Sequence, residues 1–211
     1  MELLFKNKVT GNREEFAEKV ETISAKLGII PDWLMFLMDF ETAETFSASK
    51  ENPFGCVGLI QFCPDFSGAD YKTINGVQYK MSVIKSMSNV EQLTLVYEYL
   101  KLFKGDIQEY YDLYFAILCP DMLGKPDDYS NAGCSRNNLV FDMNSNKSVT
   151  VGEVKKFLDE RVKNKVPPSY WNLFFKKKRN FLQIYQREIF FWGGIIILLI
   201  LLYVAYRKIM K

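Results

Sequence analysis

The chain of 211 residues contains no histidine, and only four of its residues are cysteines. Zinc sites in proteins use cysteine and histidine ligands, often in closely spaced pairs, and here no Cys-x-x-Cys pair exists. The sequence therefore disfavours a zinc site. In a cytoplasmic protein we expect the cysteines to be buried thiols, and one or two disulfides are the alternative if the domain lies outside the membrane. The four positions are Cys56, Cys63, Cys119 and Cys134.

The N-terminal stretch "MELLFKNKVTGNREEF" lacks an apolar run of secretory length, so we expect no signal peptide. The formal net charge is only +2, which gives little support to nucleic-acid binding. One basic cluster, "KKKR" at 176–179, is surrounded by aromatic residues. We expect this cluster to lie on anionic lipid headgroups rather than on nucleic acid.

An apolar run without any charged residue extends from Ile189 to Tyr206. As a helix it would be about 27 Å long, close to the thickness of the hydrocarbon core of a membrane. A buried core helix is the alternative, but globular helices of this length usually have a polar face. We therefore predict a single C-terminal membrane anchor at 189–206. Lys and Arg flank it at five positions before (176–179 and 187) and three after (207, 208 and 211), which favours a cytoplasmic main domain.

The rest of the chain predicts a mainly α-helical domain, because apolar residues recur at helical spacing between recognisable start and stop signals. A sizeable core is expected, since 48% of the residues are hydrophobic. Asn12 and Glu15 suggest a capped start for the first helix, and Ser88 with Glu91 suggests a capping box for a later one. Helices are predicted at 13–27, 31–41, 88–103, 106–120 and 151–164, and a hairpin is predicted at "INGVQY" with its turn at Asn75-Gly76.

The second helix, "PDWLMFLMDFE", is apolar on almost every side and ends at Glu41. A carboxylate in such surroundings is costly to bury as an ion, so its pKa should rise and leave it protonated near neutrality. That is the state that a general acid needs. Glu44, which leads into a polar loop, should be better solvated. A helix-end carboxylate that only binds loop amides is the alternative for Glu41.

Several residues around Glu41 give a resemblance to a known family. Glu41-Thr42, Phe46, Asn52-Pro53 and "GCVGLIQF" at 55–62 resemble the Glu-Ser and Gly-Leu-Met-Gln signature of lysozyme-like lytic transglycosylases and goose-type lysozymes. The later segments "MSNVEQLTLVYEYLK" and "LYFAILCP" are similar to helices of a phage-borne branch of that family. The resemblance covers about residues 13–165 and implies a lysozyme-like fold.

The resemblance also implies roles for individual residues. Glu41 would be the catalytic acid that protonates the glycosidic oxygen between N-acetylmuramic acid and N-acetylglucosamine. The tyrosine that commonly hydrogen-bonds the catalytic glutamate in the family would be Tyr114, although this chain has "LYFAIL" where the family usually has Tyr-Asn. The glycan groove would be walled by Gly58, Leu59, Ile60 and Gln61. An ordinary turn into the core and a core tyrosine are the alternatives for these positions.

Two reaction routes remain open at this stage. In the transglycosylase route a single carboxyl suffices, because the deprotonated Glu41 takes the proton of the sugar's own 6-hydroxyl and a 1,6-anhydro end results. If Asp65 or Glu44 positions a water molecule instead, the product has a reducing end, as in a hydrolytic lysozyme. Neither route requires a cofactor or a histidine.

A second, weaker pattern follows at "DMNSNKSVTVGE". It resembles a degenerate EF-hand loop and predicts a possible Ca²⁺ site. Lys147 stands where a glycine usually makes the sharp turn, and Thr150 with Glu153 also forms a capping box that needs no metal. The candidate ligands are Asp142, Asn144, Asn146, Ser148 and Glu153.

Taken together, the sequence predicts a peptidoglycan-cleaving domain at 1–165, a basic and aromatic linker at 166–188, the anchor at 189–206 and a short basic tail at 207–211. Peptidoglycan lies outside the cytoplasmic membrane, and no export signal is visible. The membrane-containing particle of a phage, with other virion proteins as partners, would resolve this conflict, and the inner membrane of a bacterium is the alternative location. A non-catalytic glycan-binding or structural virion protein is the rival function.

Overall fold

Helices dominate the computed structural model, which describes residues 2–175, so the expectation of a mainly α-helical fold is confirmed. No helix within this part of the chain is long and apolar enough to cross a membrane. The predicted anchor at 189–206 and the basic cluster at 176–179 lie outside the described residues. The helices are α1 (Arg13–Leu27), α2 (Pro31–Glu41), α3 (Met81–Ser86), α4 (Asn89–Leu100), α5 (Tyr110–Leu118), α6 (Ala132–Asn137), α7 (Val151–Lys165) and α8 (Trp171–Phe175).

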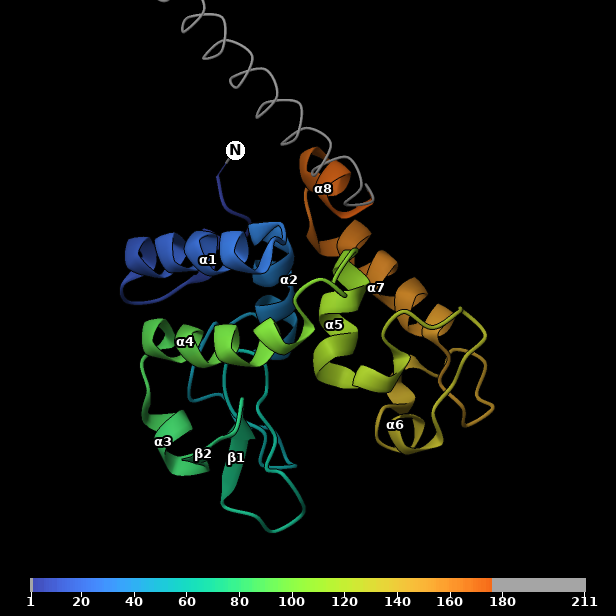
Figure 1. Cartoon of the computed structure of the whole chain (residues 1–211). Helices are drawn as coiled ribbons and strands as arrows, with labels where there is room; N and C mark the ends of the chain where they lie inside the picture. The colour runs from blue at the N-terminus through green and yellow to red at the C-terminus, as the bar shows by residue number, and fades with distance from the viewer. Residues whose placement is uncertain (1, 176–211) are drawn as a thin grey trace, which may run out of the picture. The chain divides into compact units, whose positions relative to one another are not determined.

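Helix α2 is the centre of the fold, as its sequence predicts. Seven consecutive residues, from Trp33 to Asp39, are buried. Helices α1 and α5 both pack against α2, and α4 lies beside α1 (Figure 1). A helix that is apolar all round needs cover on every side. The cover for the remaining side comes from the end of the described chain, where Trp33 donates a hydrogen bond of 2.7 Å to the carbonyl oxygen of Leu173.

That last contact shows that residues beyond 165 belong to the folded unit. The rings of Phe36 and Phe174 meet edge to face with centroids 5.3 Å apart. Tyr170 donates a hydrogen bond of 2.6 Å to the carbonyl oxygen of Glu2. The first ten residues of the predicted linker, 166–175, therefore pack against the domain.

Most helix ends follow the predicted signals. The Ser88–Glu91 and Thr150–Glu153 capping boxes are both present, and Gly28 ends α1 with a left-handed φ of 70°. The predicted Asn12 cap is wrong in detail, because its side chain donates to Glu15 instead of accepting a backbone N–H.

Helix α5 begins at Tyr110, four residues later than predicted. The cause is local: the Asp112 carboxylate accepts the backbone N–H groups of Gln108 and Glu109 at 2.8 Å each. These bonds fix the preceding residues outside the helix and satisfy donors that a helix start leaves without partners.

Strands β1 (Tyr71–Ile74) and β2 (Val77–Lys80) form the predicted hairpin, paired antiparallel from Tyr71↔Lys80 to Ile74↔Val77. Its turn residues Asn75 and Gly76 have φ values of 48° and 79°, as a two-residue hairpin turn requires. The hairpin follows a long loop, residues 42–70, which carries the "GCVGLIQF" segment.

Two disulfides correct the expectation of buried thiols. Cys56 is bonded to Cys63, and Cys119 to Cys134. The first pair flanks a short antiparallel bridge between Val57 and Phe62, and this bridge brings the two cysteines opposite each other. The second joins the end of α5 to α6.

Candidate functional site

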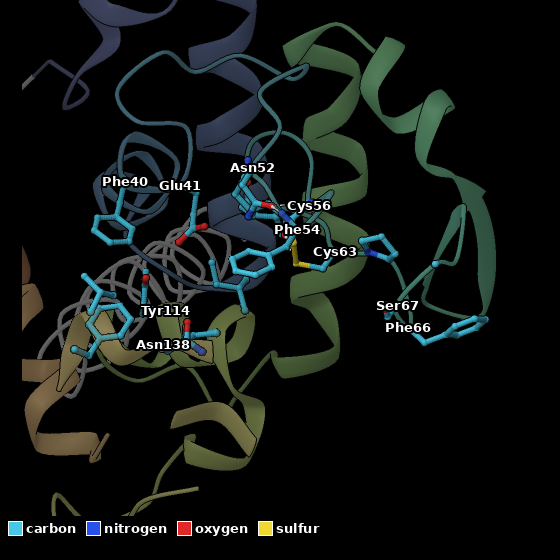
Figure 2. A pocket seen from close by; sticks show the side chains of 18 residues that line it. Phe40, Glu41, Asn52, Phe54, Cys56, Cys63, Phe66, Ser67, Tyr114 and Asn138 are labelled. Carbon is cyan, nitrogen blue, oxygen red and sulfur yellow. Dashed lines mark hydrogen bonds between the residues drawn. A yellow bond between two sulfur atoms is a disulfide. The ribbon is translucent and has the colours of Figure 1, made fainter. Parts of the chain in front are cut away.

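A groove of about 660 Å³ lies beside the end of α2 (Figure 2). Its walls come from the end of α2, the loop at 52–68, helix α5 and the segment at 138–141. Of the residues predicted to form the site, Glu41, Ile60, Gln61 and Tyr114 line this groove. Gly58 and Leu59 do not line it and lie buried behind it.

Glu41 has the protonation behaviour predicted from its place at the end of an apolar helix. Burial raises the pKa of its carboxyl group to about 7. A hydrogen bond from Tyr114 and the positive charge of Arg161 oppose this rise only in part. At neutral pH a large share of the Glu41 carboxyl groups therefore carries a proton, while the site remains open to solvent through the groove.

Tyr114 approaches Glu41 from α5, and Figure 2 shows both side chains directed into the same cavity. Its hydroxyl group lies within hydrogen-bonding reach of the Glu41 carboxyl group, and burial raises the pKa of Tyr114 well above its ordinary value. The hydroxyl group thus stays protonated and acts as a donor. Its ring packs edge to face against Phe40 and Phe141, with centroid distances of 5.3 and 5.9 Å.

Behind Glu41 lies a group of charges that the sequence did not reveal as a unit. Asp39 is fully buried and forms ion pairs with Lys8 at 2.7 Å and with Arg161 at 3.5 Å. The Arg161 guanidinium also lies 4.6 Å from the centre of the Phe40 ring. An acidic residue inside the otherwise apolar "WLMFLMDF" was the one available signal, because a buried carboxylate needs a cation.

The two acids considered as water-positioning partners lie elsewhere. Glu44 binds Lys8 at 3.0 Å and Lys165 at 2.8 Å, and hydrogen bonds from these two lysines lower its pKa to about 2. Asp65 accepts the backbone N–H of Thr73 at 3.1 Å, and its bonds with Thr73 hold the pKa of its carboxyl group below the usual value. Neither lines the groove, so Glu41 is the one carboxyl group among the groove-lining residues of the described chain.

The wall segment "GLIQ" is held by a residue that sequence reasoning missed. The side chain of Gln92, fully buried in α4, accepts the backbone N–H of Leu59 at 2.7 Å and donates to the carbonyl oxygens of Ala48 and Ile84. Gly58 has a φ of 86°, and a Cβ atom there would lie 2.1 Å from the Gln92 amide oxygen. The glycine is needed for both its conformation and this close approach.

Gln61 closes the same turn. It has a positive φ of 50°, and its side-chain amide donates to the carbonyl oxygens of Lys50 and Gly58 at 3.2 and 3.1 Å. The Gln61 side chain therefore stabilises the loop that forms the groove wall, and it also lines the groove.

The predicted calcium loop is folded around its own hydrogen bonds. The Asp142 carboxylate accepts the backbone N–H groups of Asn146 and Lys147, at 3.1 and 2.8 Å. The Glu153 carboxylate accepts from Thr150 and from the Asn144 amide, the latter at 2.8 Å. Lys147 adopts the left-handed φ of 65° that a glycine usually supplies at this place. Hydrogen bonds connect all five candidate ligands in series, because Asn146 bonds to Asp142, Asn144 and Ser148, and Asn144 bonds to Glu153.

Comparison of the chain with protein-family models, with curated proteins and with solved structures finds no match. The groove and the residues that line it are therefore the observations from which a function can be inferred.

Proposed function

We propose that the protein is a peptidoglycan lytic transglycosylase with a lysozyme-like fold, anchored in a membrane through 189–206. The observation that carries the proposal is Glu41: one carboxyl group, with a pKa raised to about 7, in a groove of about 660 Å³. A protonated carboxyl group in a cleft with no other acid is suited to donate a proton to a glycosidic oxygen.

In the proposed reaction the Glu41 proton moves to the oxygen that links N-acetylmuramic acid to the next sugar. The bond from the anomeric carbon to that oxygen breaks, and the N-acetyl group of the same sugar stabilises the positive charge. The Glu41 carboxylate then takes the proton of the sugar's 6-hydroxyl group while this oxygen bonds to the anomeric carbon. Glu41 ends protonated as it began, and Tyr114 orients it by hydrogen bonding throughout.

The surroundings of Glu44 and Asp65 favour this route over hydrolysis. Retaining and inverting hydrolases commonly place two carboxyl groups on either side of the scissile bond. Here both additional candidates are held by lysine or threonine partners and do not line the groove. The anhydro-forming route, which needs one carboxyl group, is therefore the first choice, and a muramidase that uses the same Glu41 is the second.

The two disulfides support an oxidising location for the domain. Such bonds persist mainly in extracellular and periplasmic proteins and on virion surfaces, and they are rare in the cytosol. They favour the side of the membrane on which peptidoglycan lies, against the orientation suggested by the lysine and arginine counts. We propose the membrane of a phage particle as the location and delivery during entry as the role.

The test is mass spectrometry of soluble fragments released from purified peptidoglycan by the full chain, compared with Glu41→Gln. Fragments with 1,6-anhydro ends that disappear in the variant support the transglycosylase. Reducing ends that disappear in the variant would replace it with the muramidase. Intact peptidoglycan after treatment with the oxidised wild-type protein would overturn both and favour a glycan-binding or structural virion protein.

A further inference from the structure

We propose that Phe54 and Phe66 are stacking platforms for sugar rings, and that a glycan strand several sugars long lies over them on one side of Glu41. The proposal rests on the proposed function. It adds the path of the substrate and the residues that select for long strands.

The most exposed apolar side chains gather in the groove. Within residues 2–175 the most exposed large hydrophobic side chains are Phe54 (77% exposed), Val140 (69%) and Phe66 (60%). All three line the groove that holds Glu41. Single exposed apolar residues scattered over a surface are ordinary, whereas a concentration of them in one groove indicates a binding site.

The two phenylalanines follow one another along the groove. In Figure 2 Phe54 lies next to the pair Glu41 and Tyr114, the Cys56–Cys63 disulfide follows, and Phe66 lies at the far end. The two rings thus mark successive sugar-binding subsites at increasing distance from the proposed catalytic group. A strand bound along them would place one sugar bond at Glu41 and several further sugars toward the hairpin.

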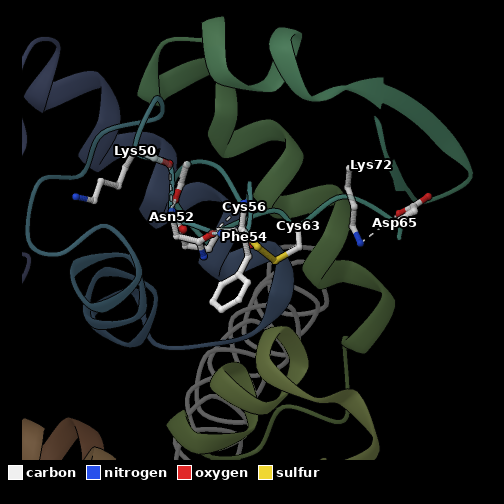
Figure 3. The surroundings of a disulfide bond; sticks show 9 residues. Lys50, Asn52, Phe54, Cys56, Cys63, Asp65 and Lys72 are labelled. Carbon is white, nitrogen blue, oxygen red and sulfur yellow. Dashed lines mark hydrogen bonds and ion pairs between the residues drawn. A yellow bond between two sulfur atoms is a disulfide. The ribbon is translucent and has the colours of Figure 1, made fainter. Parts of the chain in front are cut away.

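The turns that carry Phe54 and Phe66 are fixed by hydrogen bonds and by a disulfide. The Asn52 side chain accepts the backbone N–H groups of Phe54 and Cys56 at 2.9 and 3.1 Å, and the disulfide ties this turn to Cys63 (Figure 3). A binding surface that is fixed in advance loses little conformational entropy when its ligand arrives.

At the second subsite the Phe66 ring packs against the Tyr71 ring edge to face, with centroids 5.9 Å apart. The backbone carbonyl oxygen of Phe66 accepts the N–H of Ala69 at 3.0 Å. Asp65, next to it, is paired with Lys72 at 3.4 Å (Figure 3). The turn that presents Phe66 is therefore tied to strand β1.

The chemistry of the lining identifies the occupant. Apart from Glu41, no charged side chain among residues 2–175 lines the groove, so nucleic acid or a charged peptide would find no counter-charge from these residues there. A pyranose ring has an apolar C–H face, which suits the electron-rich face of an aromatic ring. Its hydroxyl and acetamido groups suit the amide side chains of Asn52, Gln61 and Asn138, which also line the groove. The sugar rings and N-acetyl groups of a glycan strand fit both features.

The experiment measures dissociation constants by calorimetry for peptide-free peptidoglycan oligosaccharides, a disaccharide and an octasaccharide, with the full-length Glu41→Gln protein in mild detergent. Phe54→Ala and Phe66→Ala are added to this background, and Leu102→Ala, which removes an exposed side chain outside the groove, is the matched control. Phe54→Tyr and Phe66→Tyr retain a ring and should bind the octasaccharide like the Glu41→Gln parent.

We expect Phe54→Ala to weaken octasaccharide binding by about tenfold, the effect of losing one aromatic contact. Phe66→Ala should weaken octasaccharide binding to a similar degree. It should leave disaccharide binding unchanged, because Phe66 lies far from Glu41 and a disaccharide bound next to Glu41 does not reach it. Leu102→Ala should change neither.

The proposal is overturned if the alanine variants bind like Leu102→Ala, or if Phe66→Ala weakens the disaccharide and the octasaccharide equally. An absence of oligosaccharide binding to the Glu41→Gln protein would also overturn it. Because binding is measured without turnover, a wild-type protein that binds through these rings and fails to cleave would refute the proposed reaction and leave the glycan path standing.

Discussion

The Tyr114 hydroxyl group lies within hydrogen-bonding reach of the Glu41 carboxyl group and, with Arg161, opposes part of the effect of burial, so that the net pKa of Glu41 is raised to about 7. Two opposing effects thus place the ionisation of Glu41 near neutrality. A general acid works best when its pKa is close to the operating pH. The pair therefore determines the pH at which the proposed reaction can proceed.

Tyr114→Phe should raise the pKa of Glu41, because it removes a hydrogen bond that favours the charged carboxylate. The proposed reaction needs protonated Glu41, so the wild-type rate should fall as the pH rises through about 7. In the variant this fall should occur at higher pH. The measurement is the pH profile of kcat/KM on solubilised glycan strands, with Tyr99→Phe, which removes a hydroxyl group bonded to the carbonyl of Ala116, as the control. If the pH at which kcat/KM falls is the same in Tyr114→Phe as in the wild type, Tyr114 does not set the pKa of Glu41.

The pH dependence of stability should reveal Glu41 even without substrate. Its folded pKa of about 7 lies above the ordinary 4.5, so the folded state binds the proton more tightly than the unfolded state. The stabilising contribution is complete below pH 4.5 and is lost as the pH rises to about 7, by roughly 3 kcal/mol at most. Glu41→Gln removes this dependence. The free energy of unfolding in urea should fall less steeply between these pH values in the variant than in the wild type.

Glu44→Gln provides a control of opposite sign. The folded pKa of Glu44 is lowered to about 2, so its contribution is present above pH 4.5 and is lost as the pH falls toward 2. The free energy of unfolding of Glu44→Gln should therefore differ in its pH dependence from that of the wild type below pH 4.5. For Glu41→Gln the difference should appear between pH 4.5 and about 7. If both variants follow the wild-type curve in parallel, neither carboxyl group has the assigned pKa.

Gln92→Leu should disrupt the groove wall from behind. The substitution leaves the N–H of Leu59 and the carbonyl oxygen of Ala48 without a partner, whereas the carbonyl oxygen of Ile84 keeps the N–H of Met87. Each buried polar group that loses its partner costs roughly 1–3 kcal/mol, so we expect a loss of at least about 2 kcal/mol in urea unfolding. The exposed Gln78→Leu is the matched control. A loss no greater than in that control would show that Gln92 does not hold the wall.

Both disulfides should form in the protein purified from an oxidising compartment. Thiol titration of the unfolded, unreduced chain should then find no reactive cysteine. Cys119→Ser with Cys134→Ser opens a link across a sequence separation of 15 and should cost about 3 kcal/mol of stability. Cys56→Ser with Cys63→Ser opens a shorter loop and should cost less stability, but it should weaken glycan binding more, because this pair lines the groove. If the two double variants weakened glycan binding equally, the Cys56–Cys63 disulfide would have no special role in the groove.

The calcium prediction can be tested with one conservative change. Glu153→Gln preserves a side-chain acceptor for the N-terminus of α7 and removes the carboxylate that would bind the cation through two oxygens. Without calcium, the variant and the wild type should melt at similar temperatures. With millimolar calcium, only the wild type should become more stable, and an equal response of both would assign any calcium effect to another part of the chain.

Local signals predicted much of the fold. The bounds of α2, the Asn75-Gly76 turn and the two capping boxes all depend on residues close in sequence, and the structure has them as expected. The raised pKa of Glu41 was also predictable, because it follows from one acid at the end of one apolar helix.

The features that sequence reasoning missed depend on distant residues. Asp39 meets Arg161 across 122 positions, and Gln92 reaches Leu59 across 33. No local pattern marks such partners, because each is ordinary in its own helix. The cysteine pairing, which the sequence left open as an alternative, depends on how the loop at 55–63 folds back on itself and on how α6 meets the end of α5.

The ion pairs around α2 also set an order for the synthesis of the protein. Asp39 and Glu44 share Lys8 from the beginning of the chain, whereas Arg161 and Lys165 come from α7 near the end of the domain. A nascent chain that has emerged only as far as α5 already holds Glu41 and Tyr114, yet it lacks two of the three cations that neutralise the acids beside them. The groove is therefore completed only when the ribosome has released almost the whole domain, and a truncated translation product would carry the proposed catalytic glutamate without a finished site.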